Sequence, residues 1–426
     1  MANRANPPKI QTIRPFEIPT TSQQLLPNGI ALHLLDKAAQ EDVLCLELIV
    51  AAGRIHENQQ LLSRITAKML KMGTATYSAD ALSERLDFYG TKLKVSDGFD
   101  STTLQFYCLH RHLPAMLDIM IDVFTSPAFA PSELEKLVKR SKELLRLDLS
   151  KADFVAYRHF TELIFGEQHP YGYNSFAHLY DNINVAHLQQ FHRDFYLQQP
   201  PTAVLCGNLR PELIALVAEK LAALPTAPAA INPIMPFVEN TSTMRQVLHA
   251  PLTGNQQAAI RIGRKLFNKK HEDYPAFFIL NTVLGGYFGA RLMQNLREDK
   301  GYTYGVYSSV DDMQHDGYFC IDTEVGKDVA DDALKQIYIE IAHLRDEPIT
   351  PEELEMLRNY LMGNYLSAFD GFFNRANTFS DAVNADIDLS FLQTLADITY
   401  KITAEEIQAL AQKYLQKEDL TEVVIS

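Results

Sequence analysis

The sequence is poor in cysteine, and its four cysteines show no C-x-x-C spacing. Each of them lies in an apolar, strand-like run: Cys45, Cys108, Cys206 and Cys320. We interpret them as small buried side chains. Neither a disulfide framework nor a thiol nucleophile is indicated.

Long apolar runs are also missing. No segment reaches the length needed to span a membrane. The N-terminal segment MANRANPPKIQTIRPFEIP has no apolar core of the kind found in signal peptides. A cytoplasmic location is therefore expected, or a periplasmic one if a leader has been removed.

Positive charge is in deficit, because 39 lysines and arginines stand against 53 aspartates and glutamates, for a net charge of −14. This balance argues against nucleic acid or an anionic membrane as a partner. It is compatible with peptides, basic ones included, but does not select them. The length of 426 residues is enough for two or more domains with full cores.

Histidines in a metal-binding pattern are absent as well, since neither H-x-x-E-H nor H-x-x-x-H occurs. His110 and His112 form an H-x-H without a third partner in the sequence. His187 and His192 lie five residues apart, which is off-phase for one helix face. We interpret all four as exposed or helix-end histidines.

What the sequence does contain is an internal repeat. Similar segments recur about 210 to 220 residues apart: Phe129–Glu135 with Ile349–Glu355, Asn184–Phe191 with Thr403–Leu410, and Gly53–Arg54 with Gly263–Arg264. A repeat of this length indicates a duplicated domain. Both Pro-x-Glu-Leu-Glu segments are typical of helix starts, with proline in the first turn and acids near the positive end of the helix dipole.

The repeat and a proline-rich segment predict the domain organisation. Leu224–Pro236 contains four prolines, which neither continue a helix nor join a central strand. We therefore predict an N-terminal domain at 1–223, a linker at 224–240 and a C-terminal domain at 241–426. Strands are expected first in each half and then long helices, at 30–35, 45–51, 102–109, 247–250, 258–262 and 318–324. This segregation predicts an α+β fold, with two similar domains that each pack helices on one face of a mostly antiparallel sheet.

The most informative segment is 284–304, LGGYFGARLMQNLREDKGYTY. Leu284, Phe288, Leu292 and Leu296 recur at steps of four, which predicts one face of a single helix. Gly285 and Gly286 would allow a close backbone approach. Asp299 to Gly301 is expected to end the helix, and Tyr302–Val310 to form a strand.

Arg297 and Tyr304 in this segment resemble the second half of a peptidase active site. The C-terminal domain of the pitrilysin/insulinase family, the inverted-motif zinc peptidases, has a stretch similar to L-R-E-x-x-G-x-x-Y, whose arginine and tyrosine bind substrate beside zinc. Further resemblances occur in the family's order: Leu26–Gly29, Gly53–Arg54, Met72–Thr74, His169–Gly172, Asn184–Tyr196 and Val204–Gly207. The resemblance implies two α/β sandwich domains that face each other. The alternative is that Arg297 is a helix-end cation and Tyr304 an ordinary strand aromatic.

The zinc motif of that family is missing from the corresponding place. The resemblance puts H-x-x-E-H just before Gly73-Thr74, where this chain has Arg64, Ala67 and Lys68. An arginine or lysine has no lone pair to give a metal. The chain is therefore expected to bind no zinc and to have no hydrolytic nucleophile of its own.

Glu143 lies near the sequence distance at which the family places its third zinc ligand. We hypothesise that it pairs with Arg64 or Lys68. The alternative is that Glu143 is one solvated charge on a helix.

These observations favour a non-zinc subunit of a heteromeric metallopeptidase. It would pair with a homologous zinc-bearing subunit, or form a homodimer, and would supply Arg297 and Tyr304, with Gly285 and Gly286 beside them, to a peptide substrate. Zinc is expected in the partner only. The alternatives are a structural or peptide-binding protein that kept the fold without catalysis, and a lone zinc peptidase with a metal site that the sequence does not show. Phe369–Phe373 is interpreted as a core or interface patch, or as the border of a peptide chamber.

Overall fold

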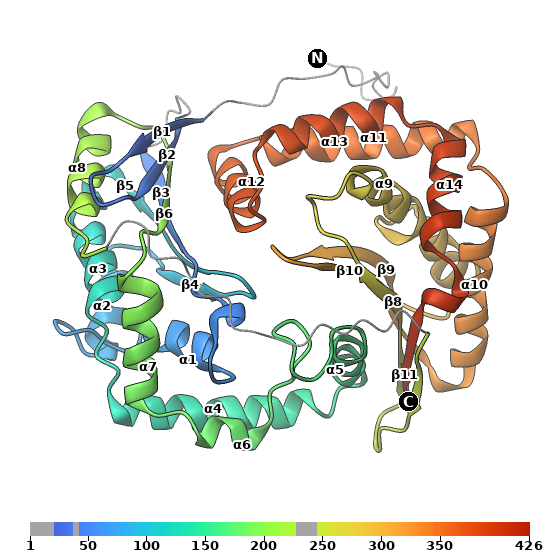
Figure 1. The fold of residues 1–426 in the computed structure, drawn as a ribbon, viewed down its shortest axis with the longest axis horizontal. Coiled ribbons are helices and arrows are strands. Elements are labelled where there is room, and N and C mark those ends of the chain that lie inside the picture. The colour runs from blue at the N-terminus through green and yellow to red at the C-terminus, as the bar shows by residue number, and fades with distance from the viewer. Residues whose placement is uncertain (1–20, 37–41, 227–244) are drawn as a thin grey trace, which may run out of the picture.

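Two mixed sheets, one from each half of the chain, form the framework of the molecule (Figure 1). The computed structural model describes residues 21–36, 42–226 and 245–426. The predicted linker therefore lies outside the described residues, except for residues 224–226, and so does the first part of the predicted N-terminal domain, residues 1–20.

The first sheet has six strands in the order β1-β2-β6-β3-β5-β4. Only β2 and β6 run parallel, and every other neighbouring pair is antiparallel. The strands are β1 (Ser22–Leu25), β2 (Ala31–Asp36), β3 (Val43–Val50), β4 (Lys94–Asp97), β5 (Thr102–Leu109) and β6 (Thr202–Gly207).

The second sheet repeats this arrangement in the order β7-β11-β8-β10-β9. Its one parallel pair is β7 with β11, which corresponds to β2 with β6 in the first sheet, and the other three pairs are antiparallel. Both sheets are mostly antiparallel, as expected, and the matching order is what a duplicated unit would produce. The strands are β7 (Val247–Ala250), β8 (Gln257–Leu266), β9 (Val306–Asp312), β10 (Gly317–Gly326) and β11 (Thr421–Ile425).

The helices repeat as well. In the first half they are α1 (Leu62–Met69), α2 (Ala79–Phe88), α3 (Leu113–Thr125), α4 (Pro131–Asp148), α5 (Ala152–Phe165), α6 (Ala177–Asp181), α7 (Val185–His192) and α8 (Pro211–Ala222). In the second half they are α9 (Tyr274–Gly285), α10 (Ala330–Asp346), α11 (Pro351–Ala368), α12 (Phe372–Asn384), α13 (Ser390–Lys401) and α14 (Ala404–Tyr414).

The repeated segments of the sequence occupy equivalent helix starts. Pro131 and Pro351 open α4 and α11, which are both 18 residues long. The side chains of Asn184 and Thr403 cap α7 and α14 by accepting a backbone N–H three residues on, at 3.0 and 3.2 Å. Proline lacks a backbone N–H, but at the first helical position that N–H has no partner within the helix. A capping side chain accepts a hydrogen bond from one of the other free N–H groups of the first turn.

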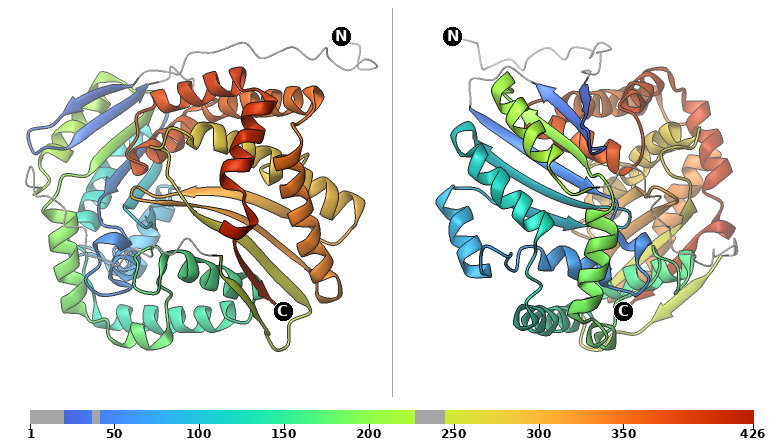
Figure 2. Two further views of the ribbon diagram at one scale, coloured as in Figure 1. Left: turned by 45° about the vertical axis from the view of Figure 1, so that its right-hand side comes forward. Right: turned by 60° about the vertical axis from the view of Figure 1, so that its left-hand side comes forward.

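One helix of each half packs on the sheet of the other half. The α5 helix packs on β8 and β11 of the second sheet, and α12 packs on β6, β2 and β3 of the first (Figures 1 and 2). A hydrogen bond accompanies each crossing. The Ser380 hydroxyl on α12 donates to the Glu47 carboxylate on β3, and the Arg261 guanidinium on β8 donates to Asp153 on α5.

This exchange explains why β3 has an almost unbroken apolar sequence, VLCLELIV. Leu44, Leu46 and Leu48 face the helices of their own half, while Cys45 and Ile49 face α12. A strand covered on both faces does not show the alternation of a half-exposed strand. Each sheet therefore has the expected helices of its own half on one face. Its other face is covered by one helix of the opposite half.

The segment Phe369–Phe373 lies at this junction. Gly371 has φ +76° between α11 and α12. The Phe373 ring meets the Tyr107 ring of β5 at a centroid distance of 4.6 Å. Because the two residues come from opposite halves, the segment belongs to an interface patch, the first of the two predicted roles.

Replacement of Phe379 by alanine tests the docking of α12. This side chain is 6% exposed and contacts the first sheet, so Phe379→Ala is expected to lower the free energy of unfolding by about 3–5 kcal/mol in denaturant titrations. Asn377→Ala, at an exposed position of the same helix, is the control and should cost clearly less. Equal losses in the two variants would contradict the docking.

Candidate functional site

Arg297 and Tyr304 lie side by side in the second half. The Arg297 guanidinium carbon is 4.8 Å from the centroid of the Tyr304 ring and 5.0 Å from that of Phe288, so two rings hold the cation. Tyr304 is 88% exposed. A guanidinium stacked on aromatic faces keeps its N–H groups, which lie in its plane, pointed outward for hydrogen bonding. The predicted pair is thus assembled and accessible.

The helix predicted through 284–300 is interrupted, and that expectation was wrong. α9 ends at Gly285, and a helical segment resumes only after Gly289, with Met293–Asp299 in a π-helical turn. Glycine is a poor helix former, so the glycine pair permits the break. Leu284, Leu292 and Leu296 are buried, but Phe288 lies in the interruption and is 57% exposed, which frees it to stack on Arg297.

The helical turn ends as predicted, at Lys300 and Gly301, and Gly301 has φ +65°. The predicted start of the following strand was too early, because β9 begins at Val306. Residues 302–305 form an irregular connection in which the Tyr302 hydroxyl donates to Asp332 at 2.8 Å. Tyr304 therefore projects from a connection and not from a strand.

Gly285 and Gly286 make close contacts within the protein. A Cβ atom at Gly285 would lie 2.7 Å from the Ser308 backbone nitrogen, and one at Gly286 would lie 2.7 Å from the Thr282 Cα atom. Asn281 and Ser308 join α9 to β9 beside Gly285 through two side-chain hydrogen bonds of 3.1 Å. The glycine pair thus brings α9 against β9 next to the arginine–tyrosine pair.

The three positions expected to replace the zinc motif all lie on α1, in the first half. Ala67 is buried, while Arg64 and Lys68 are one helical turn apart. Burial lowers the pKa of Lys68, and the nearby Arg64 and Arg140 guanidinium groups lower it further, offset in part by Asp97. A metal ion bound here would be repelled by these positively charged side chains. At a separation of about 4 Å and an effective dielectric constant of about 20, the repulsion costs ~4 kcal/mol for each pair of unit charges.

The hypothesis that Glu143 pairs with Arg64 or Lys68 is wrong. Glu143 on α4 accepts from Arg146, three residues on, at 3.2 Å, and its side chain is 61% exposed. Arg64 pairs with Asp97 of β4 at 3.2 Å. The alternative, that Glu143 is a solvated helix charge, holds because a 3.6-residue period puts Glu143 beside Arg146 on the outer face of α4.

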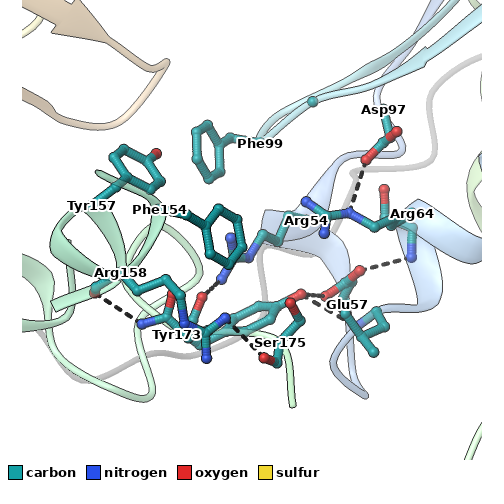
Figure 3. Close-up of a pocket in the computed structure, with 14 residues that line it drawn as sticks. Arg54, Glu57, Arg64, Asp97, Phe99, Phe154, Tyr157, Arg158, Tyr173 and Ser175 are labelled. Atoms are coloured by element: carbon teal, nitrogen blue, oxygen red, sulfur yellow. Dashed lines mark hydrogen bonds and ion pairs between the residues drawn. The ribbon is translucent and has the colours of Figure 1, made fainter. Parts of the chain in front are cut away.

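A pocket of about 240 Å³ lies beside α1 (Figure 3). Its lining comes from the short helix η1 (Arg54–His56), α1, the end of β4, α5 and the connection after α5. The residues are Arg54, Glu57, Leu61, Ser63, Arg64, Asp97, Gly98, Phe99, Phe154, Tyr157, Arg158, Tyr173, Asn174 and Ser175. Arg297 and Tyr304 do not line it, so the chain has two separate candidate regions.

Glu57 organises one wall of this pocket. Its carboxylate accepts from the Tyr173 hydroxyl at 2.5 Å and from the backbone N–H groups of Leu61 and Ser63 at 3.2 and 2.8 Å. Leu61, the residue before α1, has φ +75°, a left-handed conformation that is strained for leucine. Glu57 therefore caps the helix that bears Arg64 and holds its strained first turn.

Arg54 lies next to this network. Its guanidinium donates to the Tyr173 carbonyl oxygen and stacks on the Tyr173 ring at 3.3 Å. Gly53-Arg54 and His169–Gly172 were predicted only as points of resemblance to the family, and the sequence did not indicate the pocket between them. The signal that was available is Glu57, an acid just before a helix whose first residues offer no other capping side chain.

No group of three or more histidine, cysteine or acidic side chains is placed to hold a metal among the residues that the structure describes. His192 is buried, its Nε2 lies 2.7 Å from the Phe124 carbonyl oxygen, and burial lowers its pKa to about 4. All four cysteines are buried and free, as predicted. Within the described ranges, no helix has the length and apolar character of a membrane span.

Comparisons with known proteins identify the family of both halves. Residues 33–160 match the model described as insulinase (peptidase family M16), and residues 182–361 match the peptidase M16 inactive domain. Together the two matches span well over half of the chain.

Similar curated proteins include the "uncharacterized zinc protease YmxG" of Bacillus subtilis, 24% identical over 80% of this chain and 83% of that protein. Another is the "non-peptidase homolog YmxG" of Helicobacter pylori, 24% identical over 88% of this chain and 86% of that protein. Among solved structures, a peptidase M16 inactive domain from Pseudomonas fluorescens has a TM-score of 0.86 at 23% identity, covering 95% of this chain and 98% of its own. A protease from Helicobacter pylori has a TM-score of 0.88 at 17% identity, covering 96% and 100%.

The contribution of Glu57 to stability is expected to depend on pH. Burial raises the pKa of Glu57 to about 7 from 4.5. The folded state then binds this proton more tightly than the unfolded chain does, so the stability from this group falls as pH rises from about 4.5 to 7 and is level above that. Glu57→Gln removes the titration, and its unfolding free energy relative to wild type is expected to rise across this window. A difference between the two proteins that does not vary with pH would contradict the assignment.

The cations on α1 are expected to prevent zinc binding by this chain. After equilibration with zinc and removal of the excess, the purified chain is expected to retain no stoichiometric zinc by elemental analysis. The variant with both Arg64→His and Lys68→His replaces two repelling cations by two ligands on one helix face, and should bind zinc measurably. Stoichiometric zinc in the wild-type chain would restore the lone-peptidase alternative.

Proposed function

The chain belongs to the insulinase family of peptidases, M16, and from this premise we propose that it is the non-zinc subunit of a two-component metallopeptidase. The observation that carries the proposal is the contrast between the two candidate regions. Arg297 is held between two rings beside an exposed Tyr304, whereas α1 presents Arg64 and Lys68 where the family resemblance implies histidines.

In this proposal Arg297 and Tyr304 bind the peptide at the zinc of a partner subunit. A zinc ion held by the partner would supply the nucleophile for peptide hydrolysis, and negative charge would develop on the peptide carbonyl oxygen. The Tyr304 hydroxyl donates a hydrogen bond to that oxygen, and the Arg297 guanidinium stabilises the charge or fixes the peptide backbone. Phe288 keeps the guanidinium oriented before the substrate arrives, so little reorganisation is needed in the transition state.

The partner is a zinc-bearing homologue rather than a second copy of this chain. A homodimer would place the same two cations at both metal positions, so it would offer no zinc to either arginine–tyrosine pair. The 88% exposure of Tyr304 supports a role toward a group outside the chain. Zinc would be held entirely by the partner.

A second candidate is a peptide-binding or structural protein without catalysis. One similar protein is called a non-peptidase homolog, and that name favours this candidate. The two candidates predict different molecules bound to the chain when it is purified from the cells that produce it. A zinc-bearing homologue supports the peptidase subunit, whereas stable peptide binding with no such homologue supports the second candidate.

Cleavage by the reconstituted complex tests the peptidase role. The chain alone should not cleave peptides, and co-expression with a zinc-bearing homologue should produce activity. Arg297→Ala and Tyr304→Phe are each expected to lower kcat/KM by about 10²–10³ without loss of assembly, the typical effect of removing one oxyanion donor.

Two exposed residues elsewhere serve as matched controls. Tyr400→Phe removes a hydroxyl from a tyrosine on α13 that is 50% exposed, and Arg146→Ala removes a surface arginine of α4. Both controls should keep full activity. Full activity of the Arg297 and Tyr304 variants in the assembled enzyme would refute the proposed role.

A further inference from the structure

The pocket beside α1 has an arginine-rich lining in an acidic protein. Arg54, Arg64 and Arg158 line a volume of about 240 Å³ together with Glu57 and Asp97, although the whole chain has a net charge of −14. Arg64 is paired with Asp97, and Glu57 takes up protons near neutral pH. The lining is therefore net positive and favours an anionic ligand.

These guanidinium groups have N–H donors that are not used in hydrogen bonds within the described chain. Each makes one hydrogen bond to an oxygen of the described chain: Arg54 to the Tyr173 carbonyl, Arg64 to Asp97 and Arg158 to the Ser175 carbonyl. A guanidinium carries five N–H donors in a planar fork that matches a carboxylate. The arginines are also held in place, because Arg54 stacks on Tyr173 and Arg158 on Phe176.

Aromatic rings lie beside these arginines. Figure 3 shows the rings of Phe99 and Phe154 beside the Arg54 side chain, with Tyr157 at the same side. All three rings are only half-buried, so each offers apolar surface to a ligand. An inorganic anion would leave this surface uncovered. A ligand with a carboxylate next to an apolar group would match both the arginines and the rings.

An open sheet edge leads into the pocket. β4 is the last strand of the first sheet and pairs only with β5 in the part of the chain that the structure describes. Its final residue, Asp97, and the following Gly98 and Phe99 line the pocket. An extended peptide that adds to this edge in parallel would bring its C-terminal end to the arginines.

We propose that this pocket binds the C-terminal carboxylate of a peptide, with the side chain of the last residue against Phe99 and Phe154. The site lies apart from Arg297 and Tyr304 and needs no zinc-bearing partner. Peptide binding here neither requires nor excludes cleavage by the assembled complex, which the Arg297 and Tyr304 variants test separately.

Peptide binding to the chain alone tests this site. A fluorescent eight-residue peptide ending in phenylalanine is compared as its free acid and as its C-terminal amide by fluorescence anisotropy. The free acid is expected to bind at least about 10-fold more tightly, since charge-assisted hydrogen bonds to the carboxylate are lost in the amide. The advantage should shrink as salt is raised. Equal affinities, or no binding of either peptide, would overturn the proposal.

Variants locate the binding on the pocket. Arg64→Gln is expected to remove most of the preference for the free acid, whereas Arg146→Gln, on the surface of α4, should leave it unchanged. Phe154→Ala should instead reduce the preference for a final phenylalanine over a final glycine. Thermal melts of each variant establish that it is folded. A folded Arg64→Gln variant that keeps the full preference would place the binding elsewhere.

A small aromatic acid distinguishes the two possible sources of the carboxylate, a peptide C-terminus and a free aromatic acid. 3-Phenylpropionate has the same carboxylate and ring but no peptide backbone to pair with β4. It is expected to compete with the peptide only at concentrations at least about 10-fold higher than the unlabelled peptide. Competition at equal concentrations would show that the ligand is a free aromatic acid and not a peptide, and would overturn the peptide assignment.

Discussion

The packing of α5 and α12 across the two halves is the constraint on which the rest of the molecule depends. Phe160 of α5 reaches into the second sheet at Gly263, where an added Cβ would lie 2.9 Å from the ring and 1.9 Å from the Phe319 carbonyl oxygen. On the other side, the buried Glu47 of β3 accepts from Ser380 of α12 and from Gln105. Burial raises the pKa of Glu47, and these donors oppose that rise by stabilising the charge. Neither half therefore has a complete core alone.

This exchange also builds the pocket beside α1. Phe154, Tyr157 and Arg158 line it from α5, while Ala156 and Phe160 of the same helix are buried against the second sheet. The turn between β4 and β5 is tied to the second half as well, because Asp100 accepts the backbone N–H of Gln314 at 3.0 Å. The position of the pocket walls thus depends on contacts between residues more than 100 positions apart in the chain.

The structure separates two kinds of chemistry. Arg297, Phe288 and Tyr304 form an exposed, stacked group in the second half, while the first half has cations on α1 where a metal motif is expected from the family. Local sequence predicted the first group only in part. It identified the arginine and the tyrosine by their spacing, but it assigned Phe288 to a buried helix face. Periodicity describes a continuous helix, and the glycine pair ended that helix before Phe288.

The local sequence was enough to predict strands such as β3 and β5, the duplicated α+β plan and helix starts such as those at Pro131 and Asn184, because these depend on apolar patterns and on caps within a few residues. It also determined that α1 has no zinc ligands. Long-range packing was needed to pair Arg64 with Asp97, to bring Tyr173 to Glu57 and to pack α5 and α12 on the sheets of the opposite halves. An amphipathic helix specifies which of its faces is buried, but the sheet that buries it is chosen by long-range packing.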